Sequence, residues 1–442
     1  MLRNPLPCLA SPEPEPLLYA WWLRCWSLFC LGLIALTWPL WTGQSLFPQV
    51  PVFSWATMLP AWCDLLGVSI LLASLLSVSL LARCATARNF ALCAGIGALL
   101  ILVLLDQSRF QPWAYLAMVL AFCMFAFQPS DAIRWMRLLV VSLYFYSAIS
   151  KLDYSFLHTI GQQFLVTLAS MIHIDIGKWP LTVKLALAAG FPTWELLVAL
   201  GLSFPKTRIA AVAGAIAMHL ALLLILGPWG LEHRLGVQMW NLYFIVQTVF
   251  LFGLFGSPEK TSCKGNGTGE LAEQGTKPAP EKQPFFARLV VWSVVLLPLL
   301  EPLGWFDHWP AWGLYASRTS QVTLLVHRTA TNRLPERVRR HLEDIGTKNE
   351  SVELNLDDWA LDAVHAPIYP QARVQLGIAE SVILRWNLSH RFMVVMSGTA
   401  SRFSGKRQRR ILQDLSALRR QASTYWINSR PRRVTISLQA EH

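Results

Sequence analysis

The sequence predicts an all-α polytopic membrane bundle of about nine transmembrane helices, followed by a small C-terminal α+β extramembrane domain. Three observations support this class. Of the 442 residues, 54% are hydrophobic and only 14% are charged, whereas soluble domains carry about 25% charged residues. Long apolar stretches recur along the chain. The twenty tryptophans also fit, because indole rings favour the membrane–water interface.

Nine stretches approach the about 20 apolar residues that a hydrocarbon layer of about 30 Å requires. They are residues 23–41, 61–82, 89–105, 112–127, 137–152, 181–203, 209–226, 237–255 and 289–305. The segment before the last stretch is rich in Gly, Lys, Glu and Pro, which is typical of a disordered linker. The chain therefore divides into an N-terminal cytoplasmic tail (1–17), an eight-helix membrane body (18–256), a disordered linker (257–284), a last transmembrane helix (285–305) and an outward-facing α+β domain (306–442).

The charges of the loops predict the orientation of the bundle. The loops on one side of the predicted bundle carry only Arg109, Lys178 and Arg234, whereas those on the other side are rich in Lys and Arg. Cytoplasmic loops are enriched in Lys and Arg, so the N-terminus is expected in the cytoplasm, and an odd number of spans places everything after Trp305 outside. The cytoplasmic segments would then hold Arg3, Arg83, Arg88, Arg134, Arg137, Lys206, Arg208, Lys260, Lys264, Lys277, Lys282 and Arg288.

Beyond residue 310 the pattern changes to short elements. Alternating apolar residues predict strands at residues 321–327, 391–397 and 433–438. Helical periodicity predicts helices at 334–345, 371–386 and 406–425. In the long outer loop after the fifth span, residues 164–174 are typical of a short helix lying in the membrane interface.

The cysteines and the net charge exclude several classes of function. None of the eight cysteines belongs to a C-x-x-C pair, so neither a zinc site nor a dithiol redox centre is predicted. The formal net charge is +12, but no nucleic-acid-binding motif accompanies it. We therefore expect membrane lipids, and no nucleic acid, as partners.

Polar side chains in or at the ends of apolar spans are candidate site residues, because an unpaired ionisable group inside a membrane costs several kcal/mol. Asp106, Gln111, Trp113 and Tyr115 crowd the turn into the fourth span. This group is either part of a site or an ordinary interfacial turn, with Pro112 at a helix start and the aromatic rings in the interfacial belt.

Lys151 lies at the outer end of the fifth span, beside small residues. One interpretation is a snorkelling lysine, with its stem in lipid and its ammonium among the headgroups. The other is a base that lines a polar cavity next to Asp153 and Tyr144. The sequence leaves both open.

Three later spans each contribute a polar residue, namely Glu195, His219 and Asn241, with Trp240 beside the asparagine. Such residues are unlikely to face lipid. They either join helices through hydrogen bonds or converge on an outward-facing cavity together with Asp106 and the lysine of the fifth span.

The segment YFYSAISKLDYSFLHTIGQQFL, residues 144–165, resembles the signature of the vitamin K-dependent γ-carboxylase-like proteins, the horizontally transferred transmembrane (HTTM) family. The resemblance extends to the Asp-led turn before the fourth span, the mid-span His219, the Trp240–Asn241 pair and the segment after the last span. It covers about residues 18–326. It implies a lysine base at Lys151 that deprotonates a hydroquinone.

With this resemblance, candidate roles can be assigned. The chain has Gln111-Pro112-Trp113 where the carboxylase has an Asn-Asn-His run, and its C-terminal domain is short. We therefore expect a bacterial-type member, in the plasma (inner) membrane, that acts on a quinone-type lipid. No metal ligands are expected; the catalytic candidates are Lys151, Asp106 and His219, and the substrate-binding candidates are Gln111, Trp113, Tyr115, Glu195, Trp240 and Asn241.

Two other functions fit the sequence. One is a non-catalytic membrane scaffold whose outer domain binds a protein partner on the outer side. The other follows from a weaker resemblance, through the small-x-x-Lys motif, to four-helix redox-associated membrane proteins of the DoxX and MauE type. That resemblance implies a quinone-linked redox component.

Overall fold

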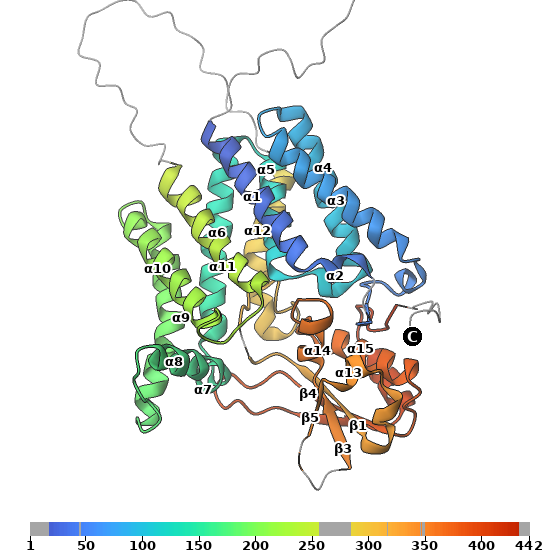
Figure 1. The fold of residues 1–442 in the computed structure, drawn as a ribbon. Coiled ribbons are helices and arrows are strands. Elements are labelled where there is room, and N and C mark those ends of the chain that lie inside the picture. The colour runs from blue at the N-terminus through green and yellow to red at the C-terminus, as the bar shows by residue number, and fades with distance from the viewer. Residues whose placement is uncertain are drawn as a thin grey trace, which may run out of the picture.

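Eight long apolar helices run alongside one another in the computed structural model, which describes residues 17–43, 46–255, 284–315, 317–344, 346 and 350–432 (Figure 1). Each is long and apolar enough to cross a membrane, which confirms a polytopic helical membrane protein. The eight are α1 (Leu17–Leu36), α3 (Trp62–Leu80), α4 (Ala85–Leu105), α6 (Pro129–Lys151), α9 (Leu181–Ser203), α10 (Arg208–Leu226), α11 (Leu235–Thr248) with its continuation η3 (Val249–Leu254), and α12 (Phe285–Leu296) with η4 (Leu297–Leu303).

The remaining predicted stretch, residues 112–127, forms α5 (Pro112–Ala126), which has only 15 residues. At a rise of 1.5 Å per residue it is about 22 Å long, shorter than a hydrocarbon layer of about 30 Å. The prediction of nine spans is therefore confirmed for eight, and the ninth is a shorter apolar helix.

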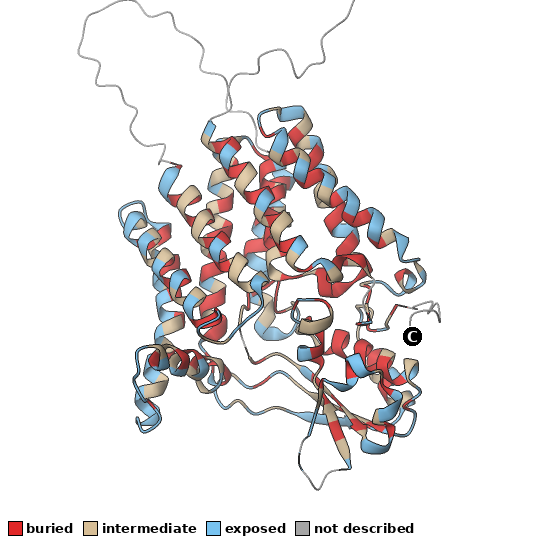
Figure 2. Cartoon of the chain, viewed as in Figure 1, coloured by how far each residue is buried: buried red, intermediate tan, exposed pale blue. Residues whose placement is uncertain are grey.

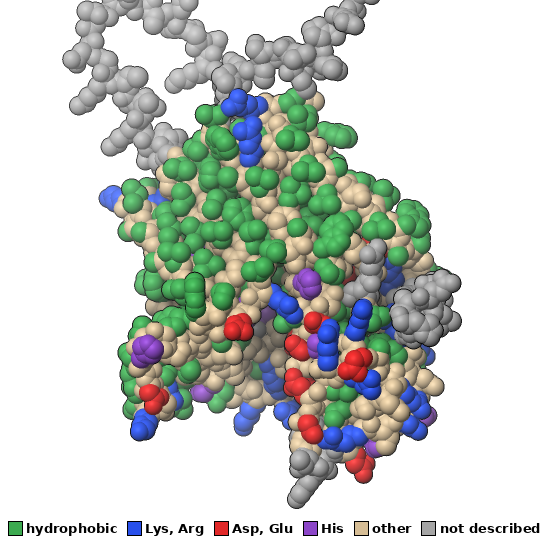
Figure 3. Space-filling view, in the orientation of Figure 1, with side chains coloured by type: hydrophobic (Ala, Val, Ile, Leu, Met, Phe, Trp, Pro, Cys, Tyr) green, Lys and Arg blue, Asp and Glu red, His purple; other side chains and the backbone are tan. Residues whose placement is uncertain are grey.

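The outer surface of the helical bundle is apolar. Figure 3 shows hydrophobic side chains over most of the bundle, while charged side chains gather over the C-terminal region at the bottom of the view. Leu28, Leu66 and Ile209 are 56%, 53% and 83% exposed on their helices. Soluble proteins rarely expose contiguous apolar surface of this extent. The inward faces carry the buried residues (Figure 2), so the bundle has a packed interior and an exterior suited to lipid.

Short helices cap the end of the bundle that adjoins the C-terminal region. Their positions follow local signals: α2 begins with Pro at its first turn, and Asp153 caps α7 by accepting a hydrogen bond from the Phe156 N–H. The interfacial helix expected at 164–174 overlaps α8, which begins and ends earlier in the sequence. These elements are α2 (Trp38–Thr42), η1 (Ser54–Met58), η2 (Gln107–Arg109), α7 (Tyr154–His158) and α8 (Ile160–Met171).

The C-terminal region is a five-stranded antiparallel sheet with helices packed on it. The strand order is β2-β3-β1-β4-β5, and the central strand places Leu324 opposite both Leu354 and Val394. These positions are buried because alternate residues of a strand face the same side. The strands are β1 (Gln321–His327), β2 (Leu342–Glu343), β3 (Ser351–Leu354), β4 (Phe392–Ser397) and β5 (Arg409–Leu412); the helices are η5 (Arg328–Arg333), α13 (Glu336–Arg339), α14 (Leu356–Ala363), α15 (Ala372–Arg385) and α16 (Leu415–Ala422).

The predicted elements of this region are confirmed in part. Strand β1 covers the predicted residues 321–327, β4 covers all but one of 391–397, and α15 covers most of 371–386. The helix predicted at 334–345 is wrong: only α13 is helical, and β2 follows it. The helix predicted at 406–425 is also wrong in its first half, where β5 pairs with β4. The strand predicted at 433–438, the tail 1–16 and most of the predicted linker lie outside the described residues.

The bundle and the sheet share one hydrophobic core. Tyr115 of α5 stacks on Trp312 with ring centroids 4.8 Å apart, and Phe47 meets Trp359 of α14 at 4.8 Å. The buried residues form one continuous cluster across this junction. The C-terminal region is thus packed firmly on one end of the bundle (Figure 1).

Candidate functional site

A cavity of about 110 Å³ lies among α6, α9, α10 and α11, near the end of the bundle that faces the C-terminal region. Five of the predicted site residues line it: Lys151, Glu195, His219, Trp240 and Asn241. They come from four different helices, and about 90 positions of the sequence separate the first residue from the last. The structure therefore brings these five side chains together around one cavity.

Lys151 and Glu195 form a buried ion pair at one side of the cavity. The Lys151 Nζ lies 2.6 Å from Glu195 Oε2, and the two side chains are 9% and 11% exposed. Nζ also donates to Ser147 Oγ at 2.6 Å. Ser147 and Lys151 are four residues apart on α6, so they lie on the same face one turn apart. The lysine is therefore held by two acceptors and does not snorkel to the surface.

A second chain of hydrogen bonds, with a defined direction, lines the opposite side. The Asn241 Nδ2 donates to the Val237 carbonyl at 2.9 Å, which leaves Oδ1 to accept from Nδ1 of His219 at 3.0 Å. With its proton on Nδ1, His219 can only accept at Nε2, and the Tyr144 hydroxyl donates to it at 2.8 Å. The histidine is thereby fixed in one neutral tautomer.

Packing holds this chain in place. The His219 ring stacks on Phe244 with centroids 4.9 Å apart and planes 5° from parallel. Thr248 Oγ1 lies 3.3 Å from the Tyr144 oxygen and can donate to it. Tyr144, Ser147 and Lys151 follow one face of α6 at spacings of three and four residues, so one helix presents polar groups to both sides of the cavity.

The remaining walls are aromatic and aliphatic. Phe164, Phe191 and Tyr315 meet edge to face at the end nearest the C-terminal region. Burial raises the pKa of the Tyr315 phenol, so it stays protonated at neutral pH. Trp194 lines the cavity and is also 42% exposed on the bundle surface. The site is therefore an apolar chamber with two polar walls, bounded on one side by a residue that faces lipid.

Asp106 does not lie at this cavity, which corrects the prediction that it converges with Lys151. Its side chain accepts from the backbone N–H of Ser108 at 3.0 Å and of Val50 at 3.3 Å. It therefore caps the turn η2 and joins the loop before α3 to that turn. Its burial is explained by these local donors and by the nearby Arg109.

Gln111, Trp113 and Tyr115 also lie away from the cavity. Gln111 donates to the Ser108 and Pro367 carbonyls at 2.8 and 3.1 Å, which ties the turn to the C-terminal region. Tyr115 packs on Trp312, as described above. Gln111 and Tyr115 occupy the junction between bundle and sheet because the turn into α5 is the surface on which the C-terminal region is packed.

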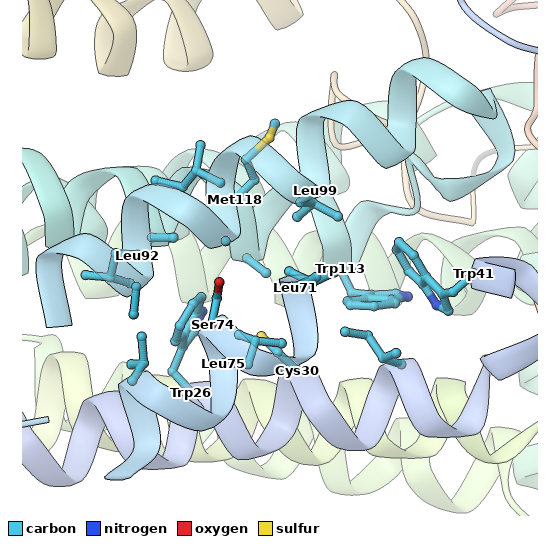
Figure 4. Close-up of a pocket in the computed structure, with 17 residues that line it drawn as sticks. Trp26, Cys30, Trp41, Leu71, Ser74, Leu75, Leu92, Leu99, Trp113 and Met118 are labelled. Atoms are coloured by element: carbon cyan, nitrogen blue, oxygen red, sulfur yellow. The ribbon is translucent and has the colours of Figure 1, made fainter. Parts of the chain in front are cut away.

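Trp113 faces a different and smaller cavity. It lines an apolar space of about 30 Å³ among α1, α3, α4 and α5, where its ring lies 5.6 Å from that of Trp41 (Figure 4). Ser74 is the polar residue in the labelled wall, and its hydroxyl donates to the Ile70 carbonyl of its own helix at 2.7 Å. The Trp26 Nε1 also lines this space and has no hydrogen-bond partner among the described residues, but no charged side chain is among the lining residues.

Sequence reasoning missed a buried charge cluster at the junction. Asp64 Oδ1 lies 2.5 Å from Arg109 Nη1, and Asp64 Oδ2 lies 2.6 Å from Arg432 Nη1. The side chains of Asp64 and Arg109 are fully buried. An aspartate in the first turn of an apolar helix signals that a cation must be near, but its partners are 45 and 368 positions away in the sequence.

Within the described ranges, no group of three or more His, Cys, Asp or Glu side chains is arranged to hold a metal ion. Comparison of the chain with protein-family models, with curated proteins and with solved structures finds no match. The chemistry of the site must therefore be argued from its own geometry and from the motif around Lys151.

Proposed function

We propose that this protein is a membrane enzyme that moves a proton to or from a lipid-soluble, quinone-like molecule bound beside Lys151 and Glu195. One observation carries the proposal: an ion pair from α6 and α9 and a directed hydrogen-bond chain from α6, α10 and α11 line the same apolar chamber. Buried ionisable groups in membrane helices are costly and are typical of functional sites. The resemblance of residues 144–165 to the γ-carboxylase-like signature supports the same assignment.

The substrate class follows from the walls. A cavity of about 110 Å³ is comparable to the apolar cavity of about 150 Å³ that binds benzene in an engineered protein. It suits one aromatic or quinone ring, with any hydrocarbon tail leaving past Trp194 into lipid. The two polar walls can each meet an oxygen of such a ring.

The ion pair can act as the base. A hydroquinone O–H that enters between the walls gives its proton to the Lys151–Glu195 pair, while the O–H electron pair remains on the substrate oxygen. The Lys151 ammonium first passes one proton to the Glu195 carboxylate, and the neutral Lys151 amine then takes the hydroquinone proton. The ammonium that is formed again in this way stabilises the hydroquinone anion. Tyr144, whose proton is engaged by His219, presents its oxygen to the other side of the ring.

The proposal includes an orientation. The start of α5 contacts the C-terminal region through Gln111 and Pro367, and the segment after α6 contacts it through Tyr154 and Arg402. The chain therefore leaves this side of the bundle along α5 and returns to it along α6. On this proposal α5 is a short ninth pass through the membrane. With the N-terminus in the cytoplasm, the cavity and the sheet lie outside, in a bacterial plasma membrane.

Cysteine labelling tests the orientation. In a cysteine-free background, Arg409→Cys on β5 and Lys206→Cys between α9 and α10 should react with a membrane-impermeant maleimide from opposite sides. Position 409 should label in intact cells and position 206 only after the membrane is opened. Equal labelling of both positions would contradict an odd number of passes between them.

Oxidation of methylhydroquinone, which has a single ring, tests the chemistry. Methylhydroquinone and O₂ give methylbenzoquinone and H₂O₂ through the hydroquinone anion, so a base that forms this anion accelerates the appearance of methylbenzoquinone absorbance. Protein in lipid nanodiscs should accelerate the reaction, and Lys151→Arg and Glu195→Gln should each lose about 10²-fold, the lower range for a positioned acid or base. Arginine keeps the charge of lysine but cannot give up its proton.

Lys184→Arg is the matched control, since Lys184 lies on α9 away from the cavity lining. It should leave the rate unchanged. A Lys151→Arg variant as active as the wild type would reduce Lys151 to a structural charge partner. Absence of acceleration by the wild type, with no quinone in lipid extracts of the purified protein, would favour the scaffold function.

A further inference from the structure

Arg318 is a buried arginine, with only 8% of the residue exposed. Its Nε and Nη1 are buried and have no hydrogen-bond acceptor among the residues that the structure describes. Other buried arginines differ: Arg109 and Arg432 contact Asp64, and Arg373 contacts Asp307. A buried guanidinium without an acceptor is strongly unfavourable. An anion from outside the chain would supply the acceptors that Nε and Nη1 lack.

A second arginine, Arg402, lies nearby, since the Ala400 N–H two residues before it donates to the Arg318 carbonyl. The Arg402 Nε is also buried and has no acceptor within the described part of the chain. Glu301 is within electrostatic range of both Arg318 and Arg402, and its carboxylate is engaged by His308 Nδ1 at 3.0 Å. Two guanidiniums therefore share one carboxylate that is already bonded to a histidine.

Asp153 is a second carboxylate at this junction. Its Oδ1 accepts from the Phe156 N–H at 2.7 Å, which caps α7. Its Oδ2 is buried without a hydrogen-bond partner among the described residues, and its charge acts on Arg407. Arg407 in turn donates to the backbone carbonyls of residues 317 and 398, at 2.6 and 2.9 Å. Positive charge thus remains in excess around Arg318.

The backbone around the two arginines is fixed before any ligand arrives. The Ala400 N–H donates to the Arg318 carbonyl at 2.9 Å, and the Tyr154 N–H donates to the Arg402 carbonyl at 2.7 Å. Three segments are tied together in this way: the turn after α6, the segment before β1 and the loop between β4 and β5. Arg402 is partly exposed, so an anion can reach the site from the surface.

We propose that Arg318 and Arg402 form a binding site for a phosphate oxyanion, supplied by a phospholipid headgroup or by free phosphate. Guanidiniums present several N–H donors in a planar fork that matches phosphate oxygens. Glu301 lies within the last candidate span, close to its end at Leu303, which places the site at the level of lipid headgroups. This site is separate from the Lys151–Glu195 cavity and does not depend on the proposed enzyme function.

Native mass spectrometry of the full-length protein tests the proposal. Delipidated wild type is titrated with phosphatidylglycerol, with phosphatidylcholine, or with inorganic phosphate. Arg318→Gln and Arg402→Gln should each weaken phosphatidylglycerol or phosphate binding about tenfold or more, the effect of losing one hydrogen bond to a charged group. Arg409→Gln, which removes an exposed arginine on β5, is the matched control and should bind like the wild type.

The two sources of phosphate give different results. Saturable binding of phosphatidylglycerol that inorganic phosphate does not displace identifies a lipid site, while binding of inorganic phosphate without lipid identifies a site for a soluble ligand. The proposal would be overturned if Arg318→Gln and Arg409→Gln weakened binding equally, or if neither variant weakened it.

Thermal unfolding separates this role from a purely structural one. Without ligand, Arg318→Met should melt at a higher temperature than the wild type, because it removes an uncompensated buried charge and keeps most of the side-chain volume. The bound anion should raise the melting temperature of the wild type and leave that of Arg318→Met unchanged. A lower melting temperature for ligand-free Arg318→Met would mean that the arginine is already satisfied by the chain, and would refute the site.

Discussion

Asp64 is predicted to be the residue on which the junction between bundle and sheet depends most. Its carboxylate meets Arg109 and Arg432 at 2.5 and 2.6 Å, with side chains that are at most 3% exposed. Asp106 lies in electrostatic range of Arg109, so the cluster balances two carboxylates against two guanidiniums. Asp64→Asn keeps the shape of the side chain but removes its negative charge and replaces one acceptor oxygen with an NH₂ donor, which would face a guanidinium.

The magnitude follows from this geometry. Removal of one partner from a buried ion pair costs about 3–5 kcal/mol, so Asp64→Asn should lower the free energy of unfolding by that amount. Arg432→Met should cost less, because Asp64 keeps Arg109. It still loses the bonds from Arg432 to Gln49 Oε1 and to the Leu59 and Pro60 carbonyls, at 2.8 to 2.9 Å.

Unfolding in mixed micelles of dodecylmaltoside and sodium dodecyl sulfate, followed by tryptophan fluorescence, measures these values. Asp131→Asn is the control, since Asp131 pairs with a largely exposed Arg134 at 3.4 Å and such pairs contribute about 0–1 kcal/mol. The reasoning would be refuted by an Asp64→Asn variant that unfolds within about 1 kcal/mol of the wild type, the range of an exposed pair.

Three further changes have defined outcomes. Lys151→Met and Glu195→Leu should each destabilise the protein by about 3 kcal/mol, and the double variant should recover most of the loss in the same titration, because it leaves no unpaired charge. Gly377→Ala would place a Cβ 2.4 Å from the Ser429 carbonyl oxygen, so the melting temperature should fall and limited proteolysis should cut near residue 429 first. Asn355→Ala removes the N-cap of α14 and should cost about 1 kcal/mol in the same unfolding titration.

The spans were predictable because their physical requirement is local. A stretch of apolar residues long enough to cross the hydrocarbon layer is visible in the sequence without knowledge of its neighbours. Helix α5 is the exception, because its residues are apolar but its 15 residues are fewer than a span of the hydrocarbon layer requires. The wrong helices at 334–345 and 406–425 have another cause. Residues 409–412 form a strand because they pair with β4. The local sequence pattern gives no information about this pairing partner.

The candidate site was predictable to the extent that burial cost is visible in a sequence. Glu195, His219 and Asn241 stand out in apolar helices, and each does line the cavity. Asp106 stands out for the same reason but is satisfied by two backbone N–H groups, a possibility that residue identity alone does not reveal. Arg318 was not predictable in this way. An arginine after the last apolar span carries no desolvation cost until the fold buries it.

The Asp64–Arg432 contact also bears on how the chain assembles during synthesis. Its two residues are separated by 368 positions, and Gln107 reaches the carbonyl of Asn428 across 321 positions. Contacts of such long range form late, because the intervening chain must be ordered first. The first helices therefore enter the bilayer while Asp64 still lacks Arg432. The charges of the early bundle are balanced only after the C-terminal region has been synthesised and packed. Ribosome-bound intermediates that lack the segment after residue 427 should be the most sensitive to quality-control proteases.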